Sequence, residues 1–188
     1  MRTVPFVIAL AAALLAGPRA AAQDSPPFEP TGELQFYGWG PAGSGASFDG
    51  KRLVGSTVNL TRRDDGTWAG DLVGQNMNLK ISQERITGAN VNLHFTQKDG
   101  RTGVEGLFFG ARVRLELDRK RFRGRFGACS LDLRRKARAF FHGDVGCQRA
   151  NADFPASGKA SLKLIGEAAE ERPPLPQFAL ALLAILPG

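Results

Sequence analysis

The chain has 188 residues, a formal net charge of +7, and 43% hydrophobic against 23% charged residues. This length suits one domain with a single hydrophobic core, and the apolar content argues against a disordered chain. Two cysteines exclude a disulfide-rich scaffold and a multi-cysteine zinc or iron–sulfur site, and two histidines argue against His-rich metal chemistry. We therefore expect no metal site and no cofactor.

The first 22 residues have the pattern of a secretory signal peptide. A basic start at Met1 and Arg2 precedes an apolar run over 4–16 and small residues at 20–22, so we expect cleavage before Gln23. An N-terminal membrane anchor is the alternative, but thirteen apolar residues fall short of the about 20 that a membrane span needs. The sequence thus predicts export by a cleaved signal peptide to an oxidising, periplasmic or extracellular location.

Residues 23–50 are rich in Pro and Gly and are expected to hold one strand, whereas 51–166 contain an internal repeat. Residues 51–60 resemble 84–93, 33 positions later, and a more divergent third copy begins at Lys120, another 36 positions on. The second half of the unit recurs at an offset of 36: Gly70, Gly74, Met77, Leu79 and Ile81 match Gly106, Gly110, Val113, Leu115 and Leu117. We expect 51–166 to form one domain of repeated β-hairpins.

Apolar and polar residues alternate along these repeats. The alternation is strict over 112–118, and similar runs occupy 76–82 and 91–96. A period of two buries one face of a strand and exposes the other. Turn signals separate the runs, and 160–165 supplies the last strand. The sequence predicts an all-β antiparallel meander of about 8–10 strands, forming a small barrel or curved sheet; a two-sheet sandwich is the alternative, and a stacked solenoid comes third.

The two cysteines are expected to form a disulfide across a pair of strands. If the hairpin between them is centred on Arg138, Cys129 faces Cys147 and Leu131 faces Val145. Opposed residues in an antiparallel pair have Cα atoms about 4.5–5.5 Å apart, which a disulfide can bridge. A reactive thiol pair is the alternative, but no Cys-x-x-Cys spacing supports it.

Positive charge is concentrated in 112–138, which contains eleven Lys or Arg residues and three acidic ones. One interpretation is a solvated, Arg-rich face. The other is a surface for phosphate- or carboxylate-bearing material, because arginine binds such groups through two parallel N–H donors. The candidate anion-binding residues are Arg112, Arg114, Arg123, Arg125, Arg134, Arg135, Lys136 and Arg138.

If a hairpin turns at 119–120, its register determines which charged side chains face each other on the two strands. Its register opposes two acid–base pairs: Glu116 with Arg123, and Asp118 with Arg121. It also sets Arg114 opposite Arg125 with no acid between them. Like charges directly opposed on paired strands are unfavourable, so either solvent or an anionic partner must relieve this contact.

The partner classes that fit such a face are an anionic lipid, lipopolysaccharide or an acidic polysaccharide. Nucleic acid is disfavoured, because Phe122 and Phe126 point to the opposite side of the hairpin and leave no stacking platform. The sequence therefore predicts an exported, non-catalytic binding protein whose basic face over 112–138 engages an anionic envelope component.

Catalytic motifs are incomplete. Residues 45–52 resemble a phosphate-binding loop superficially, but Arg52 replaces the Ser or Thr that such a loop requires. His94 falls on the polar face of a strand, and His142 lies near Asp144 without a Gly-x-Ser-x-Gly turn. We predict no catalytic residues; a hydrolase without a recognisable motif is the weaker alternative.

The last segment, 167–188, combines a Pro-rich linker with a short apolar tail over 178–186. Nine apolar residues are far short of a membrane span. We expect the tail to dock on its own domain. The alternative is contact with a membrane surface or a partner protein, which would make the chain a structural or interaction protein.

Overall fold

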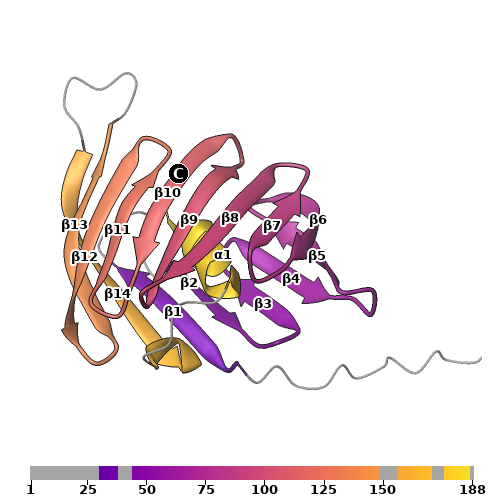
Figure 1. Ribbon diagram of the computed structural model, residues 1–188, viewed down its shortest axis with the longest axis horizontal. Coiled ribbons are helices and arrows are strands. Elements are labelled where there is room, and N and C mark those ends of the chain that lie inside the picture. Colours follow the sequence, from indigo (N-terminus) through magenta and orange to yellow (C-terminus); the bar gives the residue numbers. More distant parts are fainter. Residues whose placement is uncertain (1–29, 38–43, 149–155, 171–175, 187–188) are drawn as a thin grey trace, which may run out of the picture.

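The computed structural model describes residues 30–37, 44–148, 156–170 and 176–186, and the expected signal peptide over 1–22 lies outside them. The described residues form fourteen antiparallel strands in one meander, and β1 also pairs with β14, which closes the sheet into a barrel (Figure 1). The strands are β1 (Gly32–Tyr37), β2 (Ser44–Phe48), β3 (Arg52–Gly55), β4 (Val58–Arg62), β5 (Thr67–Leu72), β6 (Gln75–Ile81), β7 (Arg85–Gly88), β8 (Val91–Lys98), β9 (Arg101–Phe108), β10 (Ala111–Leu117), β11 (Arg121–Phe126), β12 (Cys129–Ala137), β13 (Phe140–Cys147) and β14 (Ala156–Gly166). A 3-10 turn, η1 (Glu167–Ala169), and an α-helix, α1 (Pro176–Ile185), follow them.

The predicted all-β meander and barrel are confirmed, and the described strands form neither a sandwich nor a solenoid. The strands are more numerous than the about eight to ten expected from the alternation, because each half of the repeat contains a tight turn. Two-residue turns after Gly55 and Gly88 separate β3 from β4 and β7 from β8. The segment 23–50 also contributes two strands, β1 and β2, where one was expected.

Side chains alternate between the inside of the barrel and its outer wall. On β10, for example, Val113 and Leu115 are 1% exposed, whereas Arg112 and Arg114 lie exposed on the outer wall. The inward apolar side chains of all the strands form one hydrophobic cluster. Removal of this apolar surface from water is the main favourable contribution to folding.

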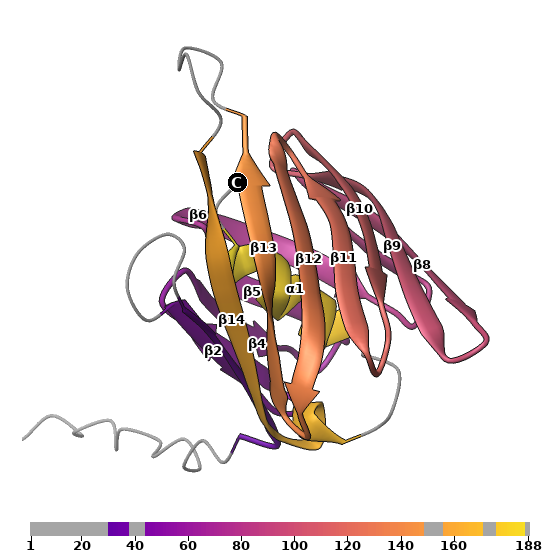
Figure 2. The ribbon, with the colours of Figure 1, turned by 90° about the vertical axis from the view of Figure 1, so that its left-hand side faces the viewer.

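Helix α1 lies inside the barrel, where strands surround it in two perpendicular views (Figures 1 and 2). The side chains over 178–186 are at most 7% exposed, so this apolar segment is buried on all sides. The Phe178 ring packs edge-on against Phe122 with centroids 5.7 Å apart, and the Thr57 hydroxyl donates a hydrogen bond to the Ala184 carbonyl at 2.6 Å. The apolar tail therefore docks within its own domain.

No helix among the described residues is both long and apolar enough to cross a membrane.

Close contacts at glycine mark the repeat in the structure. A Cβ atom at Gly70 or Gly106 would lie 2.1 or 2.0 Å from a carbonyl oxygen of the neighbouring strand, and these residues have φ angles of 140° and 143°. A Cβ at Gly143 would come within 1.9 Å of a carbonyl in the same way. The three carbonyls belong to Asn59, Asn92 and Asp132. These glycines lie on every fourth strand (β5, β9 and β13), so the repeating unit is four strands (β3–β6, β7–β10 and β11–β14) and not the two-strand hairpin that the sequence suggested.

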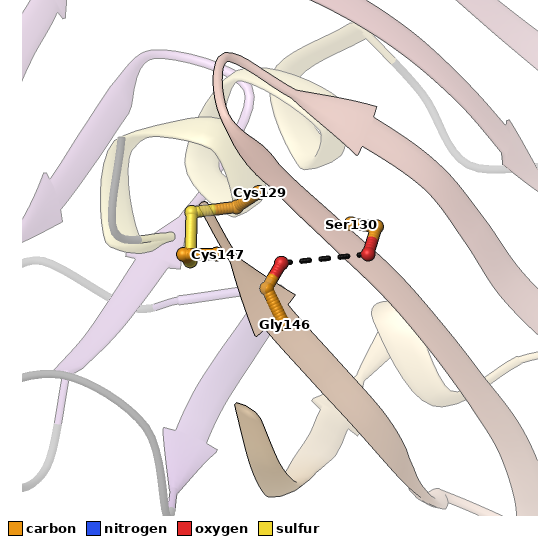
Figure 3. Close-up of a disulfide and its surroundings, with 4 residues drawn as sticks. All are labelled: Cys129, Ser130, Gly146 and Cys147. Carbon is orange, nitrogen blue, oxygen red and sulfur yellow. Dashed lines mark hydrogen bonds between the residues drawn. A yellow bond between two sulfur atoms is a disulfide. The ribbon is translucent and has the colours of Figure 1, made fainter. Parts of the chain in front are cut away.

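A disulfide joins Cys129 on β12 to Cys147 on β13, as the sequence predicted (Figure 3). The two cysteines are register partners, and their Cα atoms lie 3.9 Å apart. Beside them, the Ser130 hydroxyl donates a hydrogen bond to the Gly146 carbonyl at 3.4 Å. The disulfide thus fixes the alignment of β12 and β13 at one end of their ladder.

Candidate anion-binding face

The basic segment 112–138 forms neighbouring strands β10, β11 and β12 on the barrel wall (Figure 2). The register predicted for the β10–β11 hairpin is confirmed. Inside the barrel Leu115 opposes Gly124, and on the outer wall Arg114 opposes Arg125. The apolar inward residues thus determine which charges meet on the outside.

Two of the acidic residues on this face are neutralised by arginines of β11. Arg123 forms an ion pair with Glu116 across the hairpin, as predicted. Arg121 binds Asp132 with two N–H donors, one of them Nε at 2.5 Å from Oδ1. The hydrogen bonds from Arg121 lower the pKa of Asp132, and those same bonds raise the pKa of Arg121.

The contact expected between Asp118 and the Arg121 side chain takes another form. The Asp118 carboxylate accepts hydrogen bonds from the backbone N–H groups of Lys120 and Arg121, at 2.6 and 2.7 Å. This arrangement closes the β10–β11 turn with an aspartate side chain. The Arg121 guanidinium therefore binds Asp132 on β12 instead.

Arg114 and Arg125 remain the poorly compensated pair. Arg114 Nε lies 3.2 Å from the Glu105 carboxylate, but both side chains are largely exposed, at 81% and 65%. Such an exposed pair stabilises the fold by at most about 1 kcal/mol. Arg125 has Arg114 on one neighbouring strand and Ser130 on the other, and no carboxylate among the described residues pairs with it. Its guanidinium is available to an external anion.

The other predicted residues lie in two places. Arg112 is exposed two residues along β10 from Arg114, so it belongs to the same end of the face. Arg134, Lys136 and Arg138 are exposed near the β12–β13 turn, at the other end of β12. The structure therefore brings Arg112, Arg114 and Arg125 together and sets the second group apart from them.

Arg135 does not contribute to either group. A β-bulge between Arg135 and Ala137 shifts the β12–β13 turn by one residue from the symmetric hairpin that the sequence suggested. The Arg135 guanidinium lies 5.9 Å from the centroid of the Phe141 ring and donates hydrogen bonds to the carbonyls of Ala137 and Arg119, at 3.2 and 3.1 Å. Arg135 thus links the β10–β11 turn to the β12–β13 turn.

An open hollow of about 430 Å³ lies on the outer wall over β12, β13 and β14. It is lined by Ser130, Leu131, Asp132, Asp144, Val145, Gly146, Ser157, Gly158 and Lys159. Because Ser130 is the register partner of Arg125, the hollow borders the poorly compensated arginine pair. Sequence reasoning missed these lining residues. The cysteine pairing places Ser130 opposite Gly146, but no local signal fixes how β14 pairs with β13.

His142 contacts a serine on the neighbouring strand β14. His142 Nδ1 lies 2.9 Å from the Ser161 hydroxyl. Asp144, the acid nearest in sequence, instead accepts a hydrogen bond from Lys159 at 2.5 Å. The structure thus brings together a histidine and a serine, while the neighbouring carboxylate pairs with a lysine. Across the described ranges, no group of three or more His, Cys, Asp or Glu residues is placed to hold a metal ion.

No protein-family model matches this chain, and no curated protein or solved structure is significantly similar to it.

Proposed function

We propose that the chain is an exported, non-catalytic binding protein whose outer face around Arg114 and Arg125 binds an anionic component of the cell envelope. The observation that carries this proposal is the opposed arginine pair, in which Arg125 has an arginine on one side and a serine on the other. A bound phosphate or carboxylate would accept a bidentate hydrogen bond from Arg125 and relieve the repulsion.

The surrounding charges support binding at this place rather than over the whole segment. Arg121 and Arg123 are paired with Asp132 and Glu116, so their charges are offset within the fold. The poorly compensated pair, Arg114 and Arg125, lies at the end of the face near the disulfide. A ligand that bound Arg125 would gain charge-assisted hydrogen bonds without breaking the Arg121–Asp132 or Arg123–Glu116 ion pair.

Export rests on the signal-like pattern of 1–22, and the Cys129–Cys147 disulfide is compatible with it. The alternative role, contact through 178–186 with a membrane surface or partner, requires a segment that is buried inside the barrel. We therefore place the binding function on the outer face.

The proposal is tested by retention of the purified protein on immobilised lipopolysaccharide, acidic polysaccharide, anionic vesicles and DNA across a salt series. The test variant is Arg114→Glu with Arg125→Glu. The matched control, Arg63→Glu with Lys80→Glu, makes the same change in net charge on exposed residues of the first repeat copy. We expect retention that weakens with salt and is lost only in the test variant. Equal retention of all three proteins would contradict the proposal.

A further inference from the structure

We infer that the ligand of this face is an acidic oligosaccharide, which places a carboxylate on Arg125 and continues across the hollow over β12–β14. The inference rests on the proposed function and names its ligand class. It depends on two independent features: the poorly compensated arginine pair and the hollow that borders it.

The register aligns these features in one row. Arg125 on β11 opposes Ser130 on β12, Ser130 opposes Gly146 on β13, and Gly146 opposes Ser157 on β14. Three strand spacings at about 4.8 Å give a row roughly 14 Å long. Beyond Arg125, the outward side chains in this row are small, so an extended chain can lie close to the barrel wall.

The groups beside the row suit sugar hydroxyls. Asp132 and Asp144 are register partners at the edge of the hollow. Asp132 already accepts two hydrogen bonds from Arg121, and Asp144 accepts one from Lys159. A carboxylate has about four acceptor positions in total, so each retains capacity for a hydroxyl donor. Ser130 and Ser157 add hydroxyl groups that donate or accept.

The same acids argue against a lipid surface as the ligand. A bilayer rich in anionic lipids has a negative potential over its whole surface and attracts clustered basic residues. Docking of this face on such a surface would also bring Asp132 and Asp144 toward it. A saccharide carries neutral hydroxyls between its carboxylates, so its hydroxyls can donate to Asp132 and Asp144 while one carboxylate binds Arg125.

The test measures binding of hexagalacturonate by calorimetry, with its methyl ester and phosphatidylglycerol vesicles as comparison probes. Ser157→Tyr fills the hollow without changing charge, and Ser130→Tyr is a second variant of the same design. Thr61→Tyr is the matched control, since Thr61 is also exposed on a strand but belongs to β4. Tyrosine suits strand positions, and thermal melts check that each variant folds.

We expect the wild type and Thr61→Tyr to bind hexagalacturonate equally, and at least one Ser→Tyr variant to bind about tenfold or more weakly, a change of roughly 1.4 kcal/mol. The neutral ester should bind weakly to all the proteins. Unchanged binding in both folded Ser→Tyr variants would overturn the hollow as the saccharide site, and so would vesicle binding without hexagalacturonate binding. Either result leaves the proposed function standing if Arg114→Glu with Arg125→Glu still abolishes anion binding.

Discussion

Strands β6 and β10 occupy matching places in the first two repeat copies. The main difference between them lies in their outward-facing side chains. Their inward residues correspond at an offset of 36, Met77 with Val113 and Leu79 with Leu115, and all four are at most 3% exposed. The outward residue between them is Asn78 on β6 and Arg114 on β10. The repeat thus preserves what the barrel needs inside, while the outer wall is free to differ.

If the proposed function is correct, this difference separates the residues that the fold needs from those that bind a ligand. The inward positions and the close glycine contacts are common to the copies, so changes there should affect stability in either copy. The arginine pair and the hollow belong to the later strands, so changes there should affect binding and leave stability nearly unchanged.

The largest effect on stability is expected from deleting the helix that the barrel encloses. Deleting 173–188 removes a segment whose side chains over 178–186 are at most 7% exposed, and it leaves the barrel interior unfilled. We expect loss of the cooperative thermal transition, because each large buried aliphatic side chain contributes about 2–5 kcal/mol. An unchanged melting temperature combined with loss of membrane or partner association would show that the tail is an anchor.

The next prediction tests whether equivalent glycines in the first two repeat copies contribute equally to stability. Gly70→Ala and Gly106→Ala place a Cβ about 2 Å from a backbone carbonyl in equivalent places. Both should lower the free energy of unfolding by more than about 3 kcal/mol, by similar amounts, in urea titrations. Gly74→Ala is the matched control: its φ is +72° but nothing lies within 4 Å, so about 1–2 kcal/mol is expected. Similar losses in all three variants would show that the close contacts do not matter.

The third copy differs from the first in having a disulfide. Cys129→Ser with Cys147→Ser opens a loop of sequence separation 18. It should lower the free energy of unfolding by about 3 kcal/mol on the chain-entropy model. A reducing agent should bring the wild type to the same value and leave the variant unchanged. If reduction does not shift the wild-type transition, the disulfide contributes nothing to stability.

The smallest effect concerns the ion pair beside the hollow. The hydrogen bonds from Arg121 lower the pKa of Asp132 below its ordinary value. Their contribution to stability is therefore present above the unfolded pKa of about 3.9 and is lost as the pH falls through the lower folded value. Asp132→Asn should cost less than about 1 kcal/mol near pH 7, and the difference from wild type should shrink below about pH 4. A difference that does not change with pH would contradict this assignment.

Much of the fold could be predicted from local patterns in the sequence. Alternation at Val113, Leu115 and Leu117 predicts strand β10, and its hairpin register follows from matching those residues with the apolar positions of β11. The Cys129–Cys147 pairing follows from the same parity argument. These features depend on residues close in sequence, where turn position determines register.

The parts that could not be predicted depend on distant contacts. Closure of the barrel requires β1 to pair with β14, and nothing near Gly32 or Gly166 in sequence indicates that partner. The hollow needs Ser157 aligned with Gly146, across a connection that no turn motif defines. The β-bulge between Arg135 and Ala137, which shifts the β12–β13 turn, likewise has no signal in the alternation.

The most direct measurement of the central claim compares hexagalacturonate affinity in two charge-matched variants. Arg114→Asn with Arg125→Asn gives β10 the asparagine that β6 has at the matching position, whereas Arg63→Asn with Lys80→Asn removes the same charge from the first copy. We expect the first variant to bind about tenfold or more weakly, with an unchanged melting temperature, and the second to bind like the wild type. Equal weakening in both variants would show that net charge alone drives binding and would contradict a site at the Arg114/Arg125 pair.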